Sequence, residues 1–270
     1  MKRLFSRRTL LGFLILLGVS GIVSAKDAQD SPLSVDEVIR RAVVRARSAE
    51  ARTGQTSYTY TKLTVTEELD GSGRLKERKE KIYQVFFQGG LTHLKLLTVN
   101  GHAPAPADIR KQAEHEANTR QIIGSKSGKA SESRDNFLTP EIVERFNFKL
   151  LDEKIINDRR TYQITFEPKR PALPVHRIMD RLVDRMTGTV WIDAEEFEIA
   201  QAQIHLGSEI DLLGGVVGSL KKLAYTMTRT RVGEGQWFNT FSSGDFEGRK
   251  LLDSMRIKTR SQSSNFRPLS

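Results

Sequence analysis

The stretch from Thr187 to Leu206, TGTVWIDAEEFEIAQAQIHL, predicts a β-hairpin. Its first arm, 190–192, consists of β-branched and aromatic residues, which favour strands, and a polar corner follows at 193–196. The second arm alternates between apolar and polar residues, which is typical of an antiparallel sheet with one face in water. The two faces of this arm are Ala200, Ala202, Ile204 and Leu206 on one side and Gln201, Gln203 and His205 on the other.

Similar alternation on both sides of this hairpin predicts a mainly β fold. Asp70–Gly73 and Asn157-Asp158 carry the turn residues of further hairpins. Ser34 and Glu37 form a capping box, and an apolar stripe then predicts an amphipathic helix to Arg52. The remaining strands are expected at 56–69, 74–88, 91–99, 147–154, 161–167, 223–232, 237–246 and 252–260. Helical segments are expected at 108–123 and 139–146, and a helix or an ordered loop at 175–185.

The first 25 residues have the pattern of a cleaved export signal. Met1–Arg8 is basic, Leu10–Val23 is apolar, and Val23-Ser24-Ala25 predicts cleavage after Ala25. Fourteen helical residues would span about 21 Å, short of a ~30 Å hydrocarbon core. We therefore expect a periplasmic protein. Adjacent arginines within Ser6–Leu11 resemble a twin-arginine signal, but the strongly apolar run favours the general secretory (Sec) route.

Composition restricts the partners that the exported chain can use. The 270 residues carry a net charge of +10 and no cysteine, so disulfides and a lipidated cysteine are excluded. Removal of the signal would take four cations with it and leave +6 over 245 residues. This mild excess favours transient contact with anionic membrane surfaces and is not the footprint of a nucleic-acid-binding protein.

We expect three parts along the chain: a signal peptide at 1–25, a polar leader at 26–33 and one β domain at 34–270. Residues 102–146 interrupt the strand pattern with polar helices and a Ser/Lys/Gly-rich loop at 125–136, which we expect to be mobile. This segment has too few apolar residues for a core of its own. We interpret it as an insertion on the rim of the sheet.

Motifs of catalysis and metal binding do not emerge from the sequence. The five histidines lack metal-ligand spacing, and Gly124–Ser131 has the wrong spacing and the wrong flanking elements for a phosphate loop. Asp193, Glu195, Glu196 and Glu198 could hold a carboxylate pair for glycoside hydrolysis, but acids at a hairpin corner are more often turn residues kept in water. The sequence predicts a protein without enzymatic activity, metal or cofactor.

An apolar, glycine-rich stretch at 212–220 leaves two interpretations open. Buried, it would be a core strand or a tight turn, and exposed, it would be a flap at a cavity mouth or a membrane contact. Nine residues are too few to span a bilayer. Lys221 and Lys222, which follow directly, would suit lipid head groups. The candidate flap residues are Leu212, Leu213, Val216, Val217 and Leu220.

The order of elements between Ser34 and Arg260 resembles the LolA/LolB-like lipoprotein-carrier superfamily, in particular its outer-membrane lipoprotein-sorting branch. The most specific similarity is the G-x-V-W-I-D stretch. The residues that carry it are Gly188, Val190, Trp191, Ile192, Asp193, Phe197 and Ile199. The resemblance implies a half-open antiparallel β-barrel that curls around an apolar cavity, with an N-terminal amphipathic helix and short covering helices.

The same resemblance implies a lipid or lipoprotein carrier that holds acyl chains between membranes. The candidate cavity residues are Tyr83, Val85, Phe87, Tyr162, Ile164, Phe166 and Trp191. The alternative is an envelope stress sensor or scaffold, which would bind a protein partner through a sheet edge and carry no lipid. A hydrolase would be supported only by the acidic corner, which is the name we give to Asp193, Glu195, Glu196 and Glu198.

Overall fold

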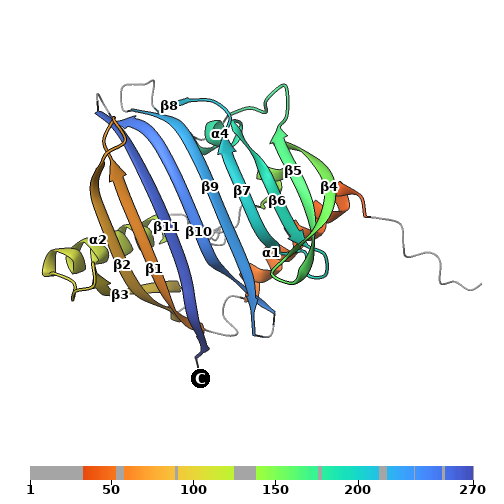
Figure 1. The fold of residues 1–270 in the computed structure, drawn as a ribbon. Coiled ribbons are helices and arrows are strands. Elements are labelled where there is room, and N and C mark those ends of the chain that lie inside the picture. Colours follow the sequence, from red (N-terminus) through yellow and green to blue (C-terminus); the bar gives the residue numbers. More distant parts are fainter. Residues whose placement is uncertain are drawn as a thin grey trace, which may run out of the picture. The chain divides into compact units, whose positions relative to one another are not determined.

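One curled, open antiparallel sheet contains eleven strands of the described chain (Figure 1). Its strand order is β3-β2-β1-β11-β10-β9-β7-β6-β5-β4, and the short strand β8 pairs with β9. The computed structural model describes residues 33–52, 58–88, 91–124, 138–175, 178–212, 218–233, 235–250 and 253–269. Within it, Ser34–Ser270 form one compact unit.

Four helices accompany the strands in this part of the chain. They are α1 (Val35–Arg52), α2 (Pro106–Gly124), α3 (Pro140–Val143) and α4 (Ile178–Val183). The strands are β1 (Tyr58–Leu69), β2 (Leu75–Gln88), β3 (Leu91–Val99), β4 (Phe146–Ile156), β5 (Arg159–Pro168), β6 (Met186–Asp193), β7 (Ile199–Leu206), β8 (Ile210–Leu212), β9 (Gly218–Val232), β10 (Gln236–Lys250) and β11 (Asp253–Pro268).

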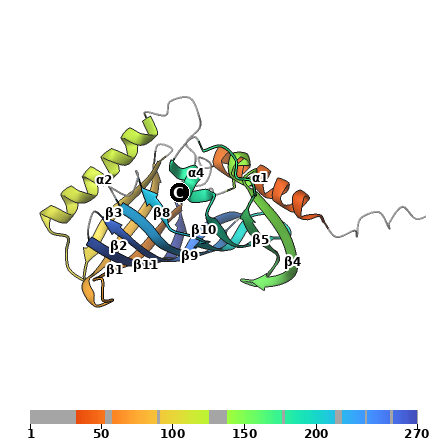
Figure 2. The same ribbon diagram turned by 90° about the horizontal axis from the view of Figure 1, so that it is seen from above.

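The two faces of the sheet differ, because α1, α2 and α4 lie on the same side of it (Figure 2). Residues that pair across neighbouring strands point to the same face, so the register assigns side chains to each side. On the helix-covered face, one row runs Lys81, Thr64, Ser261, Ser242, Met227, Ala202, Val190, Ile164, Leu150. The adjacent row, on the face that we call open, runs Glu80, Val65, Arg260, Ser243, Thr226, Gln203, Thr189, Thr165, Lys149.

Local sequence signals explain most of the elements. The predicted hairpin is formed by β6 and β7, and the predicted turn at Asn157 and Asp158 has positive φ at both residues. The capping box is confirmed by a hydrogen bond from the Glu37 backbone N–H to Ser34 Oγ. Thr139 caps α3 as predicted, but that helix ends at Val143 because Phe146 already begins β4.

Gly188 shows why the G-x-V-W-I-D stretch begins with glycine. It pairs with Phe166 on β5 and with Ile204 on β7. A Cβ atom at this position would collide with the backbone oxygen of Gln203 and with the Phe166 ring. A side chain here would force the two neighbouring strands apart, since a packed interior cannot absorb the extra volume.

Candidate functional site

The predicted cavity residues come from strands that the structure places far apart. Tyr83, Val85 and Phe87 alternate on β2, and Tyr162, Ile164 and Phe166 alternate on β5. The register puts both sets on the helix-covered face. Six strands separate β2 from β5 in the sheet, which at about 4.8 Å per strand is roughly 34 Å along its surface. Along the sheet, the two sets therefore do not form one continuous patch.

Trp191 is a correction to the predicted cavity, because it lies on the open face. It pairs with Gln163 on β5 and Gln201 on β7, whereas its neighbour Val190 pairs with Ile164. The run Val190-Trp191-Ile192 is apolar throughout, so alternation within it could not assign a face. Trp191 is nevertheless only 9% exposed. Trp191 is thus a buried residue of the open face whose partners in register are polar.

The β5 set reaches the packed core through Ile164, whereas Tyr162 and Phe166 are half-buried. Ile164 is fully buried, and Phe166 meets Phe146 edge to face with ring centroids 5.0 Å apart. The same row continues through buried Val190 and Ala202. A ligand would have to displace these side chains to reach Ile164, so this residue stabilises the fold.

The β2 set has the same pattern of burial. Val85 is 1% exposed, but Tyr83 and Phe87 on either side of it are only half-buried. Burial, together with the nearby carboxylate of Asp108 on α2, raises the pKa of the Tyr83 hydroxyl. A depression of about 300 Å³ lies beside Tyr83, and its other lining residues are polar: Thr64, Thr66, Glu68, Glu77, Lys79 and Lys81.

Four aromatic rings that the sequence analysis did not single out meet at one end of the central strands. Tyr60 stacks on Phe266 with centroids 5.0 Å apart, and Phe238 lies 5.4 Å from Tyr58 and 5.7 Å from Tyr60. We call Tyr58, Tyr60, Phe238 and Phe266 the aromatic cluster. All four side chains are half-buried. The cluster escaped prediction because β1, β10 and β11 are distant in sequence.

Hydroxyl groups line the helix-covered face between the β2 and β5 sets. Thr64 and Ser261 pair across β1 and β11, and their side-chain oxygens lie 3.0 Å apart. The same region includes Thr66, Ser242, Thr259 and Ser263. This face is consequently polar in the middle of the sheet and apolar toward β4, which differs from the expected continuous apolar lining.

Most of the predicted flap lies outside the described residues, which is the case for Leu213, Val216 and Val217. Leu212 ends β8, where it pairs with Gly218. Leu220 is half-buried in β9 and pairs with Ile210 of β8 and Gly248 of β10. Both ends of the stretch are therefore strand residues.

Asp193 and Glu198 of the acidic corner are buried and paired, so the expectation of turn acids kept in water is wrong for these two, whereas the Glu195 side chain is 76% exposed as expected. Asp193 is 1% exposed and accepts hydrogen bonds from Arg159 Nε and Nη2 at 2.6 and 2.9 Å. Burial alone would raise the pKa of Asp193, but Arg159 and the backbone N–H groups of Glu195 and Glu196 hold that pKa below its usual value.

This corner also fixes α1 to the sheet. Arg45 of α1 lies 3.3 Å from Glu196 and 3.0 Å from Glu198, and Glu198 also accepts a 2.7 Å hydrogen bond from Arg229 of β9. The Arg41 guanidinium lies over the Phe197 ring, 5.1 Å from its centroid. Each carboxylate is thus matched by arginines, which is the arrangement of a structural network and leaves no pair poised for hydrolysis.

The described part of the chain contains no group of three or more His, Asp or Glu side chains arranged to hold a metal ion. None of its helices combines the length and the apolar character required to cross a bilayer.

Comparison with known proteins yields structural similarities only. No protein-family model and no curated protein sequence matches the chain. Among solved structures, an outer-membrane lipoprotein-sorting protein domain from Vibrio parahaemolyticus matches at 12% identity and TM-score 0.32, covering 86% of this chain and 94% of its own. A LolA superfamily protein from Nitrosomonas europaea matches at 11% identity and TM-score 0.30, covering 88% and 96%.

The lipoprotein LppX of Mycobacterium tuberculosis matches at 10% identity and TM-score 0.31, covering 88% of this chain and 99% of its own. The superfamily to which the sequence was likened is thus found again among solved structures. Identities and TM-scores this low carry no argument about the function of this chain.

Proposed function

We propose that this chain is an exported, non-enzymatic protein that binds acyl chains of lipids or lipoproteins. The observation that carries the proposal is the accessible aromatic surface on the helix-covered face of β1 and β2. Tyr60, Tyr83 and Phe87 are half-buried there, around the fully buried Val85. Folding leaves this aromatic surface partly exposed to water, and the free energy falls when an apolar chain covers it.

The covering helix adds to this argument. Asp108 near the start of α2 lies 3.9 Å from Lys79 on β2, so α2 stands over the face that carries Tyr83. A site between a helix and a sheet can remove an acyl chain from water on both sides. Cleavage after Ala25 and a periplasmic location are part of the same proposal.

Adjacent phenylalanines on β2 supply a matched test. Phe87 points to the helix-covered face, and Phe86 points to the open face, where its ring stacks on His93 with centroids 5.3 Å apart. We expect Phe87→Ala to weaken binding of a fluorescent fatty acid about tenfold, since a contact worth 1–2 kcal/mol is lost. Phe86→Ala should change binding less than twofold.

The measurement is a fluorescence titration of the mature protein, accompanied by native mass spectrometry of lipids that co-purify. Equal weakening by the two substitutions would argue against this face as the site. The absence of both co-purifying lipid and fatty-acid binding in the unaltered protein would dismiss the carrier function itself.

A second candidate function is supported by the edge strand β4. It is the last strand of the sheet, and its exposed side chains include Leu151 (40%) and Ile155 (64%). Such an edge can pair with an extended segment of a protein partner, as the sensor or scaffold alternative requires. An Ile155→Lys substitution should abolish capture of that partner from envelope extracts and leave fatty-acid binding intact.

A further inference from the structure

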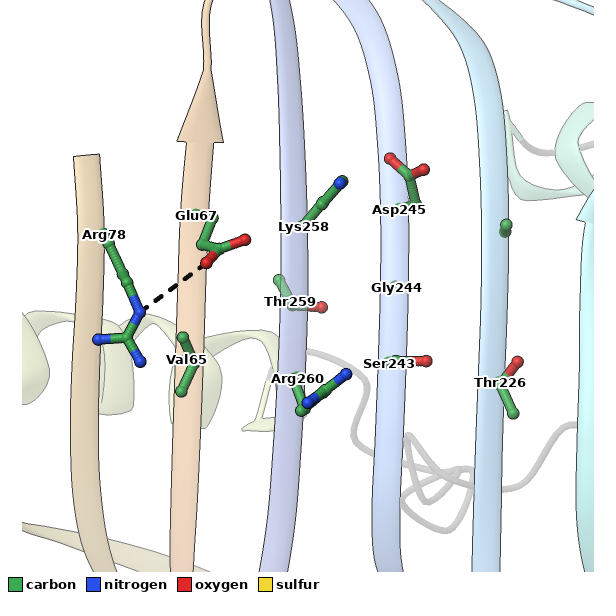
Figure 3. A pocket seen from close by; sticks show the side chains of 11 residues that line it. Val65, Glu67, Arg78, Thr226, Ser243, Gly244, Asp245, Lys258, Thr259 and Arg260 are labelled. Atoms are coloured by element: carbon green, nitrogen blue, oxygen red, sulfur yellow. Dashed lines mark ion pairs between the residues drawn. The ribbon is translucent and has the colours of Figure 1, made fainter. Parts of the chain in front are cut away.

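The open face contains a depression of about 430 Å³ that crosses the middle of the sheet, from β2 to β9 (Figure 3). It lies opposite the helix-covered face and shares no side chain with the proposed acyl-chain site. Its lining residues are Val65, Glu67, Arg78, Ala224, Thr226, Ser243, Gly244, Asp245, Lys258, Thr259 and Arg260.

Both acids in this depression already have cationic partners. Asp245 accepts hydrogen bonds from Arg256 Nη2 at 2.6 Å and from Lys222 Nζ at 2.9 Å. Glu67 lies 3.8 Å from the Arg78 guanidinium, the pair drawn dashed in Figure 3. Each acid of the depression therefore has a cationic partner other than Lys258 and Arg260, and Arg78 is shared with Glu80 at 3.3 Å.

Lys258 and Arg260 are the cations of this depression without a hydrogen bond or ion pair to any described residue. They stand two positions apart on β11, so their Cα atoms are about 6.7 Å from each other and their side chains leave the same face. Long side chains at this spacing can reach one small anion together. Two positive charges side by side repel each other, and an anion that neutralises both lowers the free energy.

Two hydroxyl groups extend this cationic pair across the sheet. Ser243 of β10 lies directly opposite Arg260, and Thr226 of β9 lies directly opposite Ser243. Within the described ranges, neither side-chain hydroxyl makes a hydrogen bond to the protein. Lys258, Arg260, Ser243 and Thr226 thus present four side-chain donor groups to one open volume (Figure 3).

We propose that this depression binds a phosphate monoester group. A guanidinium can engage two phosphate oxygens at once, an ammonium neutralises the remaining charge, and hydroxyls satisfy further lone pairs. The volume exceeds that of one phosphate and leaves room for the group that the phosphate esterifies. The same chemistry is offered by a small soluble phosphate ester and by the headgroup of phosphatidic acid.

The test is an isothermal titration with inorganic phosphate and with glycerol 3-phosphate at low ionic strength. We expect the variant Lys258→Gln/Arg260→Gln to bind either probe at least about tenfold more weakly, because two charge-assisted contacts are lost. The control is Lys149→Gln/Lys154→Gln, which removes the same charge from exposed residues of the open face on β4. This control should bind like the unaltered protein.

Vesicles distinguish the two sources of phosphate. Co-sedimentation with phosphatidic acid vesicles that fails in Lys258→Gln/Arg260→Gln, together with unchanged behaviour toward phosphatidylcholine, identifies the membrane headgroup. Loss confined to glycerol 3-phosphate identifies a soluble ester. Equal affinities of this variant and the β4 control for every probe would overturn the proposal, because binding would then follow net charge alone.

Discussion

At the scale of single residues, the acidic corner shows how burial changes the role of a charge. Asp193 contacts almost no water, so its charge is tolerated only because Arg159 and two backbone N–H groups surround it. The Arg159 guanidinium also lies 5.7 Å from the Trp237 ring, on the β10 side of the corner. A single arginine therefore connects strands that are not neighbours in the chain.

Removing this arginine should leave a buried charge without its partner. We expect Arg159→Met to lower the free energy of unfolding by about 3 kcal/mol, as for other buried pairs that lose one member. The adjacent Arg160 is a matched control, because its side chain is 65% exposed and lies 3.7 Å from Glu153. Arg160→Met should change stability by less than about 0.5 kcal/mol. Urea unfolding followed by Trp fluorescence measures both, and similar losses would contradict a structural role for the corner.

At the scale of elements, helix α1 illustrates what periodicity predicts well. The apolar stripe was read from spacing alone, and it holds the buried residues Val38, Ile39 and Ala42. Away from this stripe, Arg40 and Arg41 are exposed, whereas Arg45 is half-buried and lies 3.0 Å from Glu198. Sequence spacing places a side chain on a helix face but does not reveal an acid that arrives from residue 196 or 198.

Two valines of this helix allow a direct comparison of buried and exposed positions. Val38 is fully buried, whereas Val44 is 52% exposed. We expect Val38→Ala to lower the free energy of unfolding by about 2 kcal/mol, and Val44→Ala by less than about 0.5 kcal/mol. Thermal or urea unfolding of the two variants provides the measurement. A larger loss from Val44→Ala would mean that α1 buries a different face.

Strands show the limit of the same reasoning. Hairpins such as β6–β7 were predicted because alternation and turn residues are local signals. The face on which Trp191 lies was not predicted, because every residue from 190 to 192 is apolar. Only the pairing with β5 and β7 assigns this residue to a face. The pairing of β1 with β11 was not predicted either, because no local sequence pattern specifies which distant strands pair.

At the scale of the whole molecule, the two faces of the sheet divide the chemistry. The helix-covered face joins a packed apolar core near β4 to half-buried aromatics near β2, with hydroxyls between them. The open face carries the basic depression and its paired acids. Acyl chains and phosphate groups would consequently be bound on opposite sides, so each site can be altered without disturbing the other.

Acid should weaken the ion pairs that join the three central strands. Hydrogen bonds from Arg256 and Lys222 lower the pKa of Asp245 to about 2, below its ordinary value near 3.8. A carboxyl with a depressed pKa stabilises the fold above its unfolded pKa and loses that contribution as the pH falls toward 2. We expect Asp245→Asn to cost about 1 kcal/mol at pH 6, allowing for solvent screening, and almost nothing at pH 2. Urea unfolding at several pH values tests this, and a constant difference would contradict it.

The pairing of β1 with β11 has a consequence for the order in which the protein can fold. Leu69 pairs with Arg256 and Tyr58 with Pro268, so the strand that completes the centre of the sheet follows the other described strands in the chain. Until it arrives, β1 and β10 each present an unpaired inner edge, and such edges invite pairing with other chains. The pairing of β1 with β11 is slow, because a long segment of chain separates the two strands. Until β11 pairs with both of them, a newly made chain therefore exposes two strand edges at which aggregation can begin.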